Sequence, residues 1–208
     1  MKEQIRDIGK LSAEKHAQIL ASARGIFIKL GFERASVDLI ASQAGVSKAT
    51  VYNHFKDKNA LFLQCLREYP KAMEEDISAI LRNESGNIED ILQMIGERFL
   101  KFLLSPQAMS IHRLFVSEVL RFPELGRAFF EKGPLRMRKK LADFLQLWHD
   151  RGKLRIEDPD LAAAQFLTLC HLDLLIRMEL RIIPLPTNEE IRSKVQTAVR
   201  FFLRGYRP

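Results

Sequence analysis

The residues best suited to bind a charged polymer lie close together, within the stretch SVDLIASQAGVSKATVYNHFKDKNAL that begins at residue 36. Lys48 can donate to guanine acceptors, the Ala49 methyl group can meet a thymine methyl, and Asn53 suits an adenine edge. Phosphate oxygens accept hydrogen bonds from hydroxyl, phenol, imidazole and ammonium groups. Such groups are supplied by Thr50, Tyr52, His54 and Lys58. Together these side chains form a candidate DNA-contacting surface.

Two short predicted helices must position these side chains. Ser36 caps the first helix, whose N-terminal backbone N–H groups can bind a phosphate. Gly45 ends it and can adopt the left-handed conformation of a tight turn. Ser47 begins the second helix, whose first residues would enter a major groove, so the pair reads as a helix-turn-helix. We expect its inner face to be packed by Ala41, Ala44, Val46, Val51, Phe55 and Leu61.

The order A-x-x-A-G-V-S-x-x-T-x-Y-x-H-F-x-x-K-x-x-L, from Ala41 to Leu61, resembles the N-terminal domain of the TetR family of transcriptional regulators. The preceding helix, predicted from Ser12 to Leu30 after a loose arm over residues 1–11, ends at Gly31 and also fits that family. The resemblance implies that the matching positions contact the bases and backbone of a double-stranded DNA operator. It also implies a helix-turn-helix domain over residues 1–58 and a larger helical ligand-binding and dimerisation domain over 59–208.

Each of these contact residues has a simpler interpretation. Tyr52 can be a core aromatic side chain between helices, and His54 can be a surface or capping histidine. Lys48 and Lys58 can be merely solvated. The residue types alone leave these alternatives open, and the motif favours DNA contact.

The composition predicts an all-α fold. Of the 208 residues, 47% are hydrophobic, and no alternating run of β-branched residues is long enough for a strand. After the motif, one long helix is predicted over 57–83, kinked by Pro70. Further helices are predicted over 87–104, 107–121, 123–151, 159–182 and 187–204, with Gly133-Pro134 expected to kink or split the helix over 123–151.

Charge and cysteine content narrow the function class. The net charge is +7, and its excess is denser in residues 1–60, which suits a partner with phosphates although the excess is modest. Cys65 and Cys170 lie far apart in apolar helical patterns, which indicates buried thiols in a reducing cytoplasm and no metal site. The polar N-terminus and the lack of ~18 consecutive apolar residues predict neither a signal peptide nor a membrane span. Since no catalytic or nucleotide-binding motif is recognisable, we expect neither an enzyme nor a cofactor.

The C-terminal part holds large apolar side chains that can line a cavity between helices, with a few polar ones among them. The candidate ligand-binding residues are Phe99, Phe102, His112, Arg113, Phe115, Phe144, Trp148 and His171. The apolar members can equally be core, and the polar members can form buried pairs with each other. A metal site is disfavoured because the Glu-x-x-His spacing is absent. The TetR resemblance implies a small-molecule inducer, which the apolar candidates predict to be hydrophobic.

The segments RFPELGRAFFEKGP (121–134) and AVRFFLRGYRP (198–208) further resemble a C-terminal subtype found in AefR-like proteins.

The last two predicted helices carry apolar faces wider than one partner helix covers, so a homodimer through them is expected. These faces comprise Leu161, Phe166, Leu169, Leu172, Leu175, Ile176, Ile191, Val195, Val199, Phe202 and Leu203. A twofold dimer would place two reading helices about 34–36 Å apart on a near-palindromic operator. The predicted function is a repressor released from that operator by its ligand; a regulator without an inducer and a helical enzyme are the alternatives.

Overall fold

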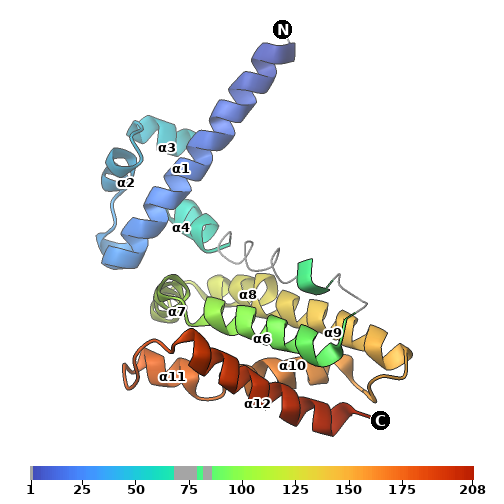
Figure 1. The fold of residues 1–208 in the computed structure, drawn as a ribbon. Coiled ribbons are helices and arrows are strands. Elements are labelled where there is room, and N and C mark those ends of the chain that lie inside the picture. Colours follow the sequence, from blue (N-terminus) through green and yellow to red (C-terminus); the bar gives the residue numbers. More distant parts are fainter. Residues whose placement is uncertain (1, 68–78, 82–85) are drawn as a thin grey trace. The chain divides into compact units, whose positions relative to one another are not determined.

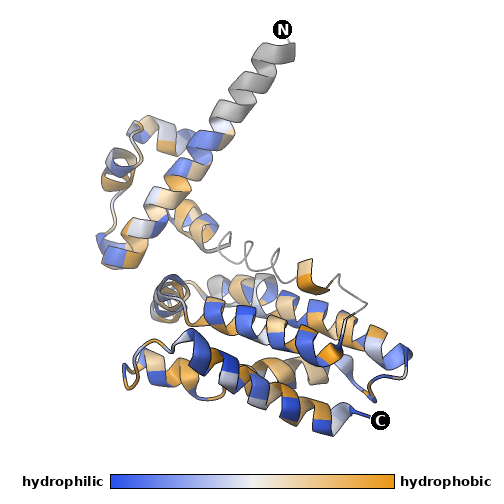
Figure 2. Cartoon of the chain, viewed as in Figure 1, coloured by the Kyte–Doolittle hydropathy of each residue, from blue (hydrophilic) through white to orange (hydrophobic). Residues whose placement is uncertain are grey.

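The structure is a computed structural model that describes the backbone of residues 2–67, 79–81 and 86–208, and the side chains of most of them. These residues fold into α-helices, with no strand among them (Figure 1). The prediction of an all-α fold is therefore confirmed. Hydrophobic and hydrophilic residues alternate around the helices, as expected where one face of each helix is buried (Figure 2).

The chain packs as two compact units. The first comprises residues 1–69 together with 110–129, and the second comprises 70–109 together with 130–208. Ile111, Leu114 and Phe115 are buried in the same core as the N-terminal helices, which explains the grouping of 110–129 with them. The predicted domain division after residue 58 stays a prediction.

The first unit is built around α1 (Lys2–Arg34). This helix packs against α2 (Val37–Gln43) and α4 (Lys58–Arg67), and α2 packs against α3 (Lys48–His54). The C-terminal part of α7 (Pro106–Glu118) and most of α8 (Pro123–Lys132) complete the unit. Its fully buried side chains include Ile19, Phe27, Ile40, Leu61 and Phe62.

The two ends of α1 differ in how well they follow the sequence pattern. Because α1 begins at Lys2, the predictions of a loose arm over residues 1–11 and of a helix start at Ser12 were wrong. The segment 2–11 holds Lys, Glu, Gln and Arg and no proline, and its one glycine, Gly9, costs only about 1 kcal/mol relative to alanine. At the other end, Gly31 has φ 75° and ψ 173°, a conformation that suits glycine, and the predicted break is confirmed.

The second unit comprises α6 (Ile88–Leu103), α9 (Pro134–Asp150), α10 (Pro159–His171), α11 (Leu174–Glu179) and α12 (Asn188–Tyr206). α10 packs against α6, α9 and α12, and α12 packs along α6. At the crossing of α6 and α12, a Cβ atom on Gly96 would lie 2.5 Å from Val195 Cγ1. Glycine is therefore what allows these two helices to approach so closely.

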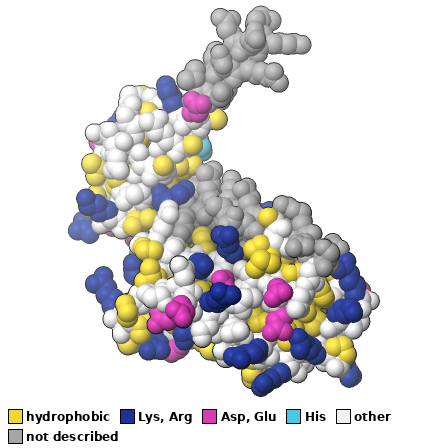
Figure 3. All heavy atoms as spheres, in the orientation of Figure 1, with side chains coloured by type: hydrophobic (Ala, Val, Ile, Leu, Met, Phe, Trp, Pro, Cys, Tyr) yellow, Lys and Arg dark blue, Asp and Glu magenta, His cyan; other side chains and the backbone are white. Residues whose placement is uncertain are grey.

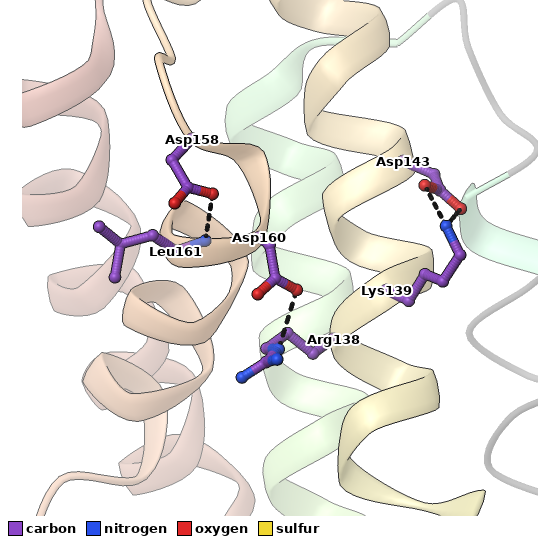
Figure 4. A network of polar contacts seen from close by, with 6 residues as sticks. All are labelled: Arg138, Lys139, Asp143, Asp158, Asp160 and Leu161. Atoms are coloured by element: carbon purple, nitrogen blue, oxygen red, sulfur yellow. Dashed lines mark hydrogen bonds and ion pairs between the residues drawn. The ribbon is translucent and has the colours of Figure 1, made fainter. Parts of the chain in front are cut away.

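Polar contacts fix the beginning of α10 and its alignment with α9 (Figure 4). Asp158 Oδ1 accepts a hydrogen bond from Leu161 N at 3.0 Å and so caps α10. Asp160 Oδ1 lies 2.9 Å from Arg138 Nε of α9, which joins the two helices. On the exposed side of α9, Lys139 pairs with Asp143 one turn later, a contact that contributes little free energy in water.

The predicted helices over 87–104, 107–121 and 187–204 correspond to α6, α7 and α12, and the remaining three test where the chain breaks. The split at Gly133-Pro134 is confirmed, because α8 ends at Lys132 and α9 begins at Pro134. The prediction of a single helix over 159–182 was wrong. The chain breaks at Leu172, whose φ is 38°, and forms α10 and α11. The long helix over 57–83 is seen as α4 and residues 79–81, while its middle, with Pro70, lies outside the described residues. None of the described helices is long and apolar enough to cross a membrane.

Candidate nucleic-acid interface

α2, its following turn and α3 form the predicted helix-turn-helix. The Ser36 hydroxyl accepts from Leu39 N at 3.1 Å and caps α2. Gly45 has φ 63°, and the next residue closes the turn with a backbone hydrogen bond from Val46 N to Ala41 O of 3.0 Å. The Ser47 hydroxyl accepts from Thr50 N at 3.0 Å and caps α3. Both predicted caps and the glycine turn are confirmed.

The inner face of this motif is packed as predicted. Ala41, Ala44, Val51, Phe55 and Leu61 are buried, and Val46 packs at the edge of the same core. Within α3, Val51 is 1% exposed and anchors the helix. Its neighbours Lys48, Ala49, Tyr52 and Asn53 are exposed, so α3 has one buried side and one side open to a partner.

Tyr52 and His54 differ in exposure. The Tyr52 side chain is 46% exposed, which rules out the core-aromatic interpretation. His54 is half-buried, and its ring lies 5.6 Å from that of His16 on α1, edge to face. The His16 ring in turn stacks on Phe55 at 4.7 Å. His54 is therefore held against α1 at the end of α3, while Tyr52 projects into solvent.

Lys48 is held by a residue that the sequence pattern did not single out. Its Nζ atom lies 2.9 Å from Asp38 Oδ2, on α2, and the two side chains are 51% and 67% exposed. The hydrogen bond to Asp38 and the charge of that carboxylate raise the pKa of Lys48 above its usual value. The two residues are ten positions apart across a turn, a separation that helical periodicity does not reveal.

Lys58 has contacts unlike those of the other predicted site residues. Its ammonium group donates to the carbonyl oxygens of Phe32 at 2.9 Å, Glu33 at 3.3 Å and Ala35 at 2.9 Å. A lysine ammonium group has three N–H donors, so these carbonyls can occupy all of them. Lys58 thus caps the C-terminal end of α1, and its contact with phosphate stays a prediction.

The candidate ligand-binding residues are divided between the two units. His112, Arg113 and Phe115 belong to the first unit, where Phe115 is buried and its ring centroid lies 4.2 Å from that of Phe129, with the two rings tilted. The second unit holds Phe99, Phe102, Phe144, Trp148 and His171. In that unit the Phe99 and His171 rings lie 6.3 Å apart, and the Phe144 and Trp148 rings lie 6.0 Å apart. The structure brings these two pairs together within the second unit.

Among these candidates, Trp148 is distinguished by the environment of its indole N–H group. The side chain is 7% exposed, and its Nε1 atom is buried without a hydrogen-bond partner in the part of the chain that the structure describes. Burying an N–H group without an acceptor costs free energy. The Trp148 indole is therefore a donor that a bound acceptor could satisfy.

α10 and α12 expose an apolar face in the second unit, and hydrophobic side chains are visible on the surface of this unit in Figure 3. Phe201 is 66% exposed and Leu161 is 51% exposed. Both line a groove of about 730 Å3 together with Thr168, Leu169 and Gly205. The predicted α12 residues of this face are instead buried in the unit's own core, which corrects that interpretation: Ile191, Val195, Val199, Phe202 and Leu203. Phe201, which the periodic pattern missed, is the exposed aromatic residue here.

Cysteines and groups of metal-ligating side chains are the remaining candidates for a reactive centre. The thiols of Cys65 and Cys170 are buried, as predicted. Burial raises the pKa of the Cys170 thiol to about 12, so it stays protonated at neutral pH. Among residues 2–67, 79–81 and 86–208, no three His, Cys, Asp or Glu side chains are grouped to hold a metal ion.

Comparisons with known proteins agree with this architecture. Residues 19–65 match the family model described as bacterial regulatory proteins, tetR family, and residues 90–208 match the AefR-like transcriptional repressor C-terminal domain. A putative TetR-family regulator from Mesorhizobium loti MAFF303099 has a similar structure, with a TM-score of 0.89 and 29% identity over 95% of this chain and 98% of that one. The flavonoid-responsive regulator FrrA has a TM-score of 0.78 and 30% identity, covering 94% of this chain and 98% of its own. The transcriptional activator FasR of Mycolicibacterium smegmatis is 31% identical over 90 residues, which are 43% of this chain and 41% of FasR, so less than half of that relative is matched.

Proposed function

Because the chain belongs to the TetR family of transcriptional regulators, we propose that it is a repressor that leaves a palindromic DNA operator when a small molecule binds. The observation that carries this proposal is the exposed side of α3. There Lys48, Ala49, Tyr52 and Asn53 face solvent, while Val51 fixes the helix to the core. Hydrogen-bonding groups and a methyl group on one side of a rigid helix are what a major groove can receive.

The proposed contacts follow from the chemistry of each side chain. Lys48, Ala49 and Asn53 read base edges. The phosphate contacts are made by Ser36, Ser47, Thr50, Tyr52 and His54. Lys58 acts indirectly. From the start of α4 its ammonium group caps the C-terminal end of α1, and this contact holds together the helices that support α2 and α3.

A second copy of the chain is the proposed cover for the apolar face of α10 and α12. Phe201 and Leu161 are large, exposed and beside an apolar groove, the combination found at the centre of protein interfaces. In a twofold dimer the same surface is used by both copies. Two α3 helices about 34–36 Å apart would then require a near-palindromic site.

A hydrophobic small molecule is the proposed inducer. Trp148 supplies a buried, unsatisfied N–H, and Phe144 supplies an aromatic wall beside it. The name of the similar regulator FrrA says that it responds to flavonoids, which supports ligand response in a protein of this fold. A ligand shifts the balance only by its preference for one state, so a ~100-fold loss of operator affinity needs about 2.7 kcal/mol of differential binding.

The proposed route of the signal within the first unit runs through the end of α1. Arg121, which follows α7, forms an ion pair with Glu33 and lies 5.2 Å from the centroid of the Phe32 ring. Lys58 lies 4.3 Å from the centroid of the same ring. A displacement of α7 would therefore change the contacts of Arg121 with Glu33 and Phe32, at the end of α1 that Lys58 joins to α4.

Selection of genomic DNA fragments with the purified full-length protein tests the proposal, followed by binding measurements at several salt concentrations. We expect a near-palindromic sequence to be enriched, and its affinity to fall about 10-fold or more in Lys48→Ala and in Asn53→Ala. Glu14→Gln is a matched control, because it changes one charge on α1 and leaves α3 intact.

Failure to enrich any sequence, with binding that vanishes at ordinary salt, would overturn the DNA-binding proposal. A reporter gene fused to the enriched site gives the sign of regulation. A thermal-shift screen of hydrophobic compounds then tests the inducer: a compound that raises Tm and releases the operator supports it. A regulator that no compound releases would be the constitutive alternative.

A further inference from the structure

The carboxylate of Asp38 and the ammonium group of Lys48 form a pair on the side of the helix-turn-helix that carries the proposed base contacts. Asp38 lies in the first turn of α2, and Lys48 is the first residue of α3. Their charged atoms are 2.9 Å apart, and both side chains are more than half exposed. The pair therefore stands at the surface, where DNA would approach.

Stability of the fold does not account for this pair. Exposed ion pairs contribute about 0–1 kcal/mol. The packing of α2 on α3 is already secured by the buried Ile40 and Val51 and by the turn hydrogen bond from Val46 N to Ala41 O. A carboxylate on this surface also repels the phosphates of DNA, which opposes the ~0.3–1 kcal/mol that an acidic residue in the first turn of α2 contributes through the helix dipole.

We propose that Asp38 is a specificity-determining residue, which holds the ammonium group of Lys48 toward a base edge and away from the phosphates. This inference rests on the proposed DNA binding by α3. An unrestrained lysine is a flexible point charge, and near DNA such charges bind phosphates, which carry no sequence information. Paired with Asp38, the ammonium group keeps two N–H donors, which match the O6 and N7 acceptors of guanine.

The pair also changes how binding depends on salt. Because Asp38 neutralises Lys48, that lysine displaces no phosphate counterion, and binding to random DNA is correspondingly weaker. In Asp38→Asn, Lys48 is released toward the nearest phosphate. Affinity for random DNA then rises, the slope of log K against log salt steepens by about one, and the preference at one base pair in each half-site is lost.

The experiment selects sequences from a library randomised at each half-site position, using the full-length wild type, Asp38→Asn, Asp38→Glu, Lys48→Ala and the double variant Asp38→Asn with Lys48→Ala. We expect wild type and Asp38→Glu, which keeps a carboxylate, to select guanine at one position. Asp38→Asn, Lys48→Ala and the double variant lose that preference by about 10-fold or more. Only Asp38→Asn gains affinity for random DNA, since the other two lack the lysine.

A matched control separates this effect from a general gain in positive charge. Glu14→Gln removes one acidic charge from α1 in the same unit, and it should keep the wild-type base preference. If Asp38→Asn keeps that preference and merely binds all sequences more tightly, Asp38 is a repulsive surface charge and the inference is overturned. If the wild type itself selects no sequence, the proposed function fails, which is a distinct result.

Discussion

The ammonium group of Lys58 caps the Phe32 carbonyl at 2.9 Å and lies 4.3 Å from the centroid of the ring of the same residue. One lysine thus satisfies the end of α1 and contacts an aromatic side chain that packs against Phe62 and Phe122. Carbonyls at the end of a helix lack partners within the helix, and a cation there also interacts favourably with the helix dipole. Lys58 belongs to the motif that resembles the TetR family, and its contacts give it a structural role there.

Replacement of Lys58 by methionine should lower the free energy of unfolding by about 2 kcal/mol, because hydrogen bonds to a charged donor are lost while the side-chain volume is kept. Urea denaturation followed by far-UV circular dichroism measures the change. Lys56→Met is the control, since Lys56 is an exposed lysine two residues earlier. Unchanged stability together with a large loss of operator affinity would show that Lys58 binds phosphate directly and that its capping contacts contribute little.

Phe201 should anchor the dimer. Its side chain is exposed in the single chain, so Phe201→Glu should leave the subunit folded. Central aromatic anchors contribute about 2 kcal/mol or more each, and a twofold dimer contains two, so the dimer Kd should rise by roughly 1,000-fold. Sedimentation equilibrium over a concentration series measures it. Leu120→Glu changes an exposed apolar residue of the first unit and should leave the dimer intact; equal weakening by both substitutions would argue against Phe201 as the anchor.

The helix-turn-helix could be predicted because its signals are local. Ser36 and Ser47 accept hydrogen bonds from residues three positions later, and Gly45 needs only its own backbone freedom. Such short-range relations follow from residue type and order alone. The same reasoning identified the buried and exposed sides of α3 from the position of Val51.

The contacts that modify this site could not be predicted in the same way. Lys58 meets Phe32 across 26 positions, and Lys48 meets Asp38 across ten, so both depend on how separate helices pack. The break at Leu172 contains neither glycine nor proline and leaves no local signal. Phe115 was assigned to a ligand pocket by its type, whereas its place in the first core depends on the tertiary packing of α7.

Acidification should weaken the start of α12 through Glu190. The Thr187 backbone N–H donates to the Glu190 carboxylate at 2.7 Å, and this bond lowers the pKa of Glu190. The charged carboxylate therefore stabilises the fold at pH values above the usual glutamate pKa, and that contribution is lost as the pH falls through the lowered pKa. Between pH 7 and pH 3, Tm should fall less in Glu190→Gln than in the wild type, because glutamine keeps a side-chain acceptor and does not titrate. Thermal unfolding at a series of pH values measures the difference. Parallel pH profiles for the two proteins would mean that this carboxylate makes no pH-dependent contribution.

The close approach of α6 and α12 makes Gly96 sensitive to a single added methyl group. In Gly96→Ala the new Cβ meets Val195 Cγ1 at 2.5 Å and Cys170 Sγ at 3.1 Å, so overpacking should cost about 2 kcal/mol despite the better helix propensity of alanine. In a Val195→Ala background the same substitution should cost less than about 0.5 kcal/mol, because the first of these contacts is removed.

Gly205→Ala is the matched control for that experiment, since nothing lies within 4 Å of a Cβ atom built on this helical glycine. Because Gly205 also lines the groove that a second copy is proposed to cover, the control is measured in the Phe201→Glu background. There it should stabilise the protein by up to about 1 kcal/mol, the difference in helix propensity. Urea denaturation of all four variants gives the double-mutant cycle and the control in one series. Equal effects of Gly96→Ala and Gly205→Ala would show that α6 and α12 stand farther apart in solution. If Gly96→Ala lowers the free energy of unfolding of the wild type and not that of the Val195→Ala variant, the steric clash lies at this crossing. Val195→Ala is the one change in the series that removes the valine methyl groups.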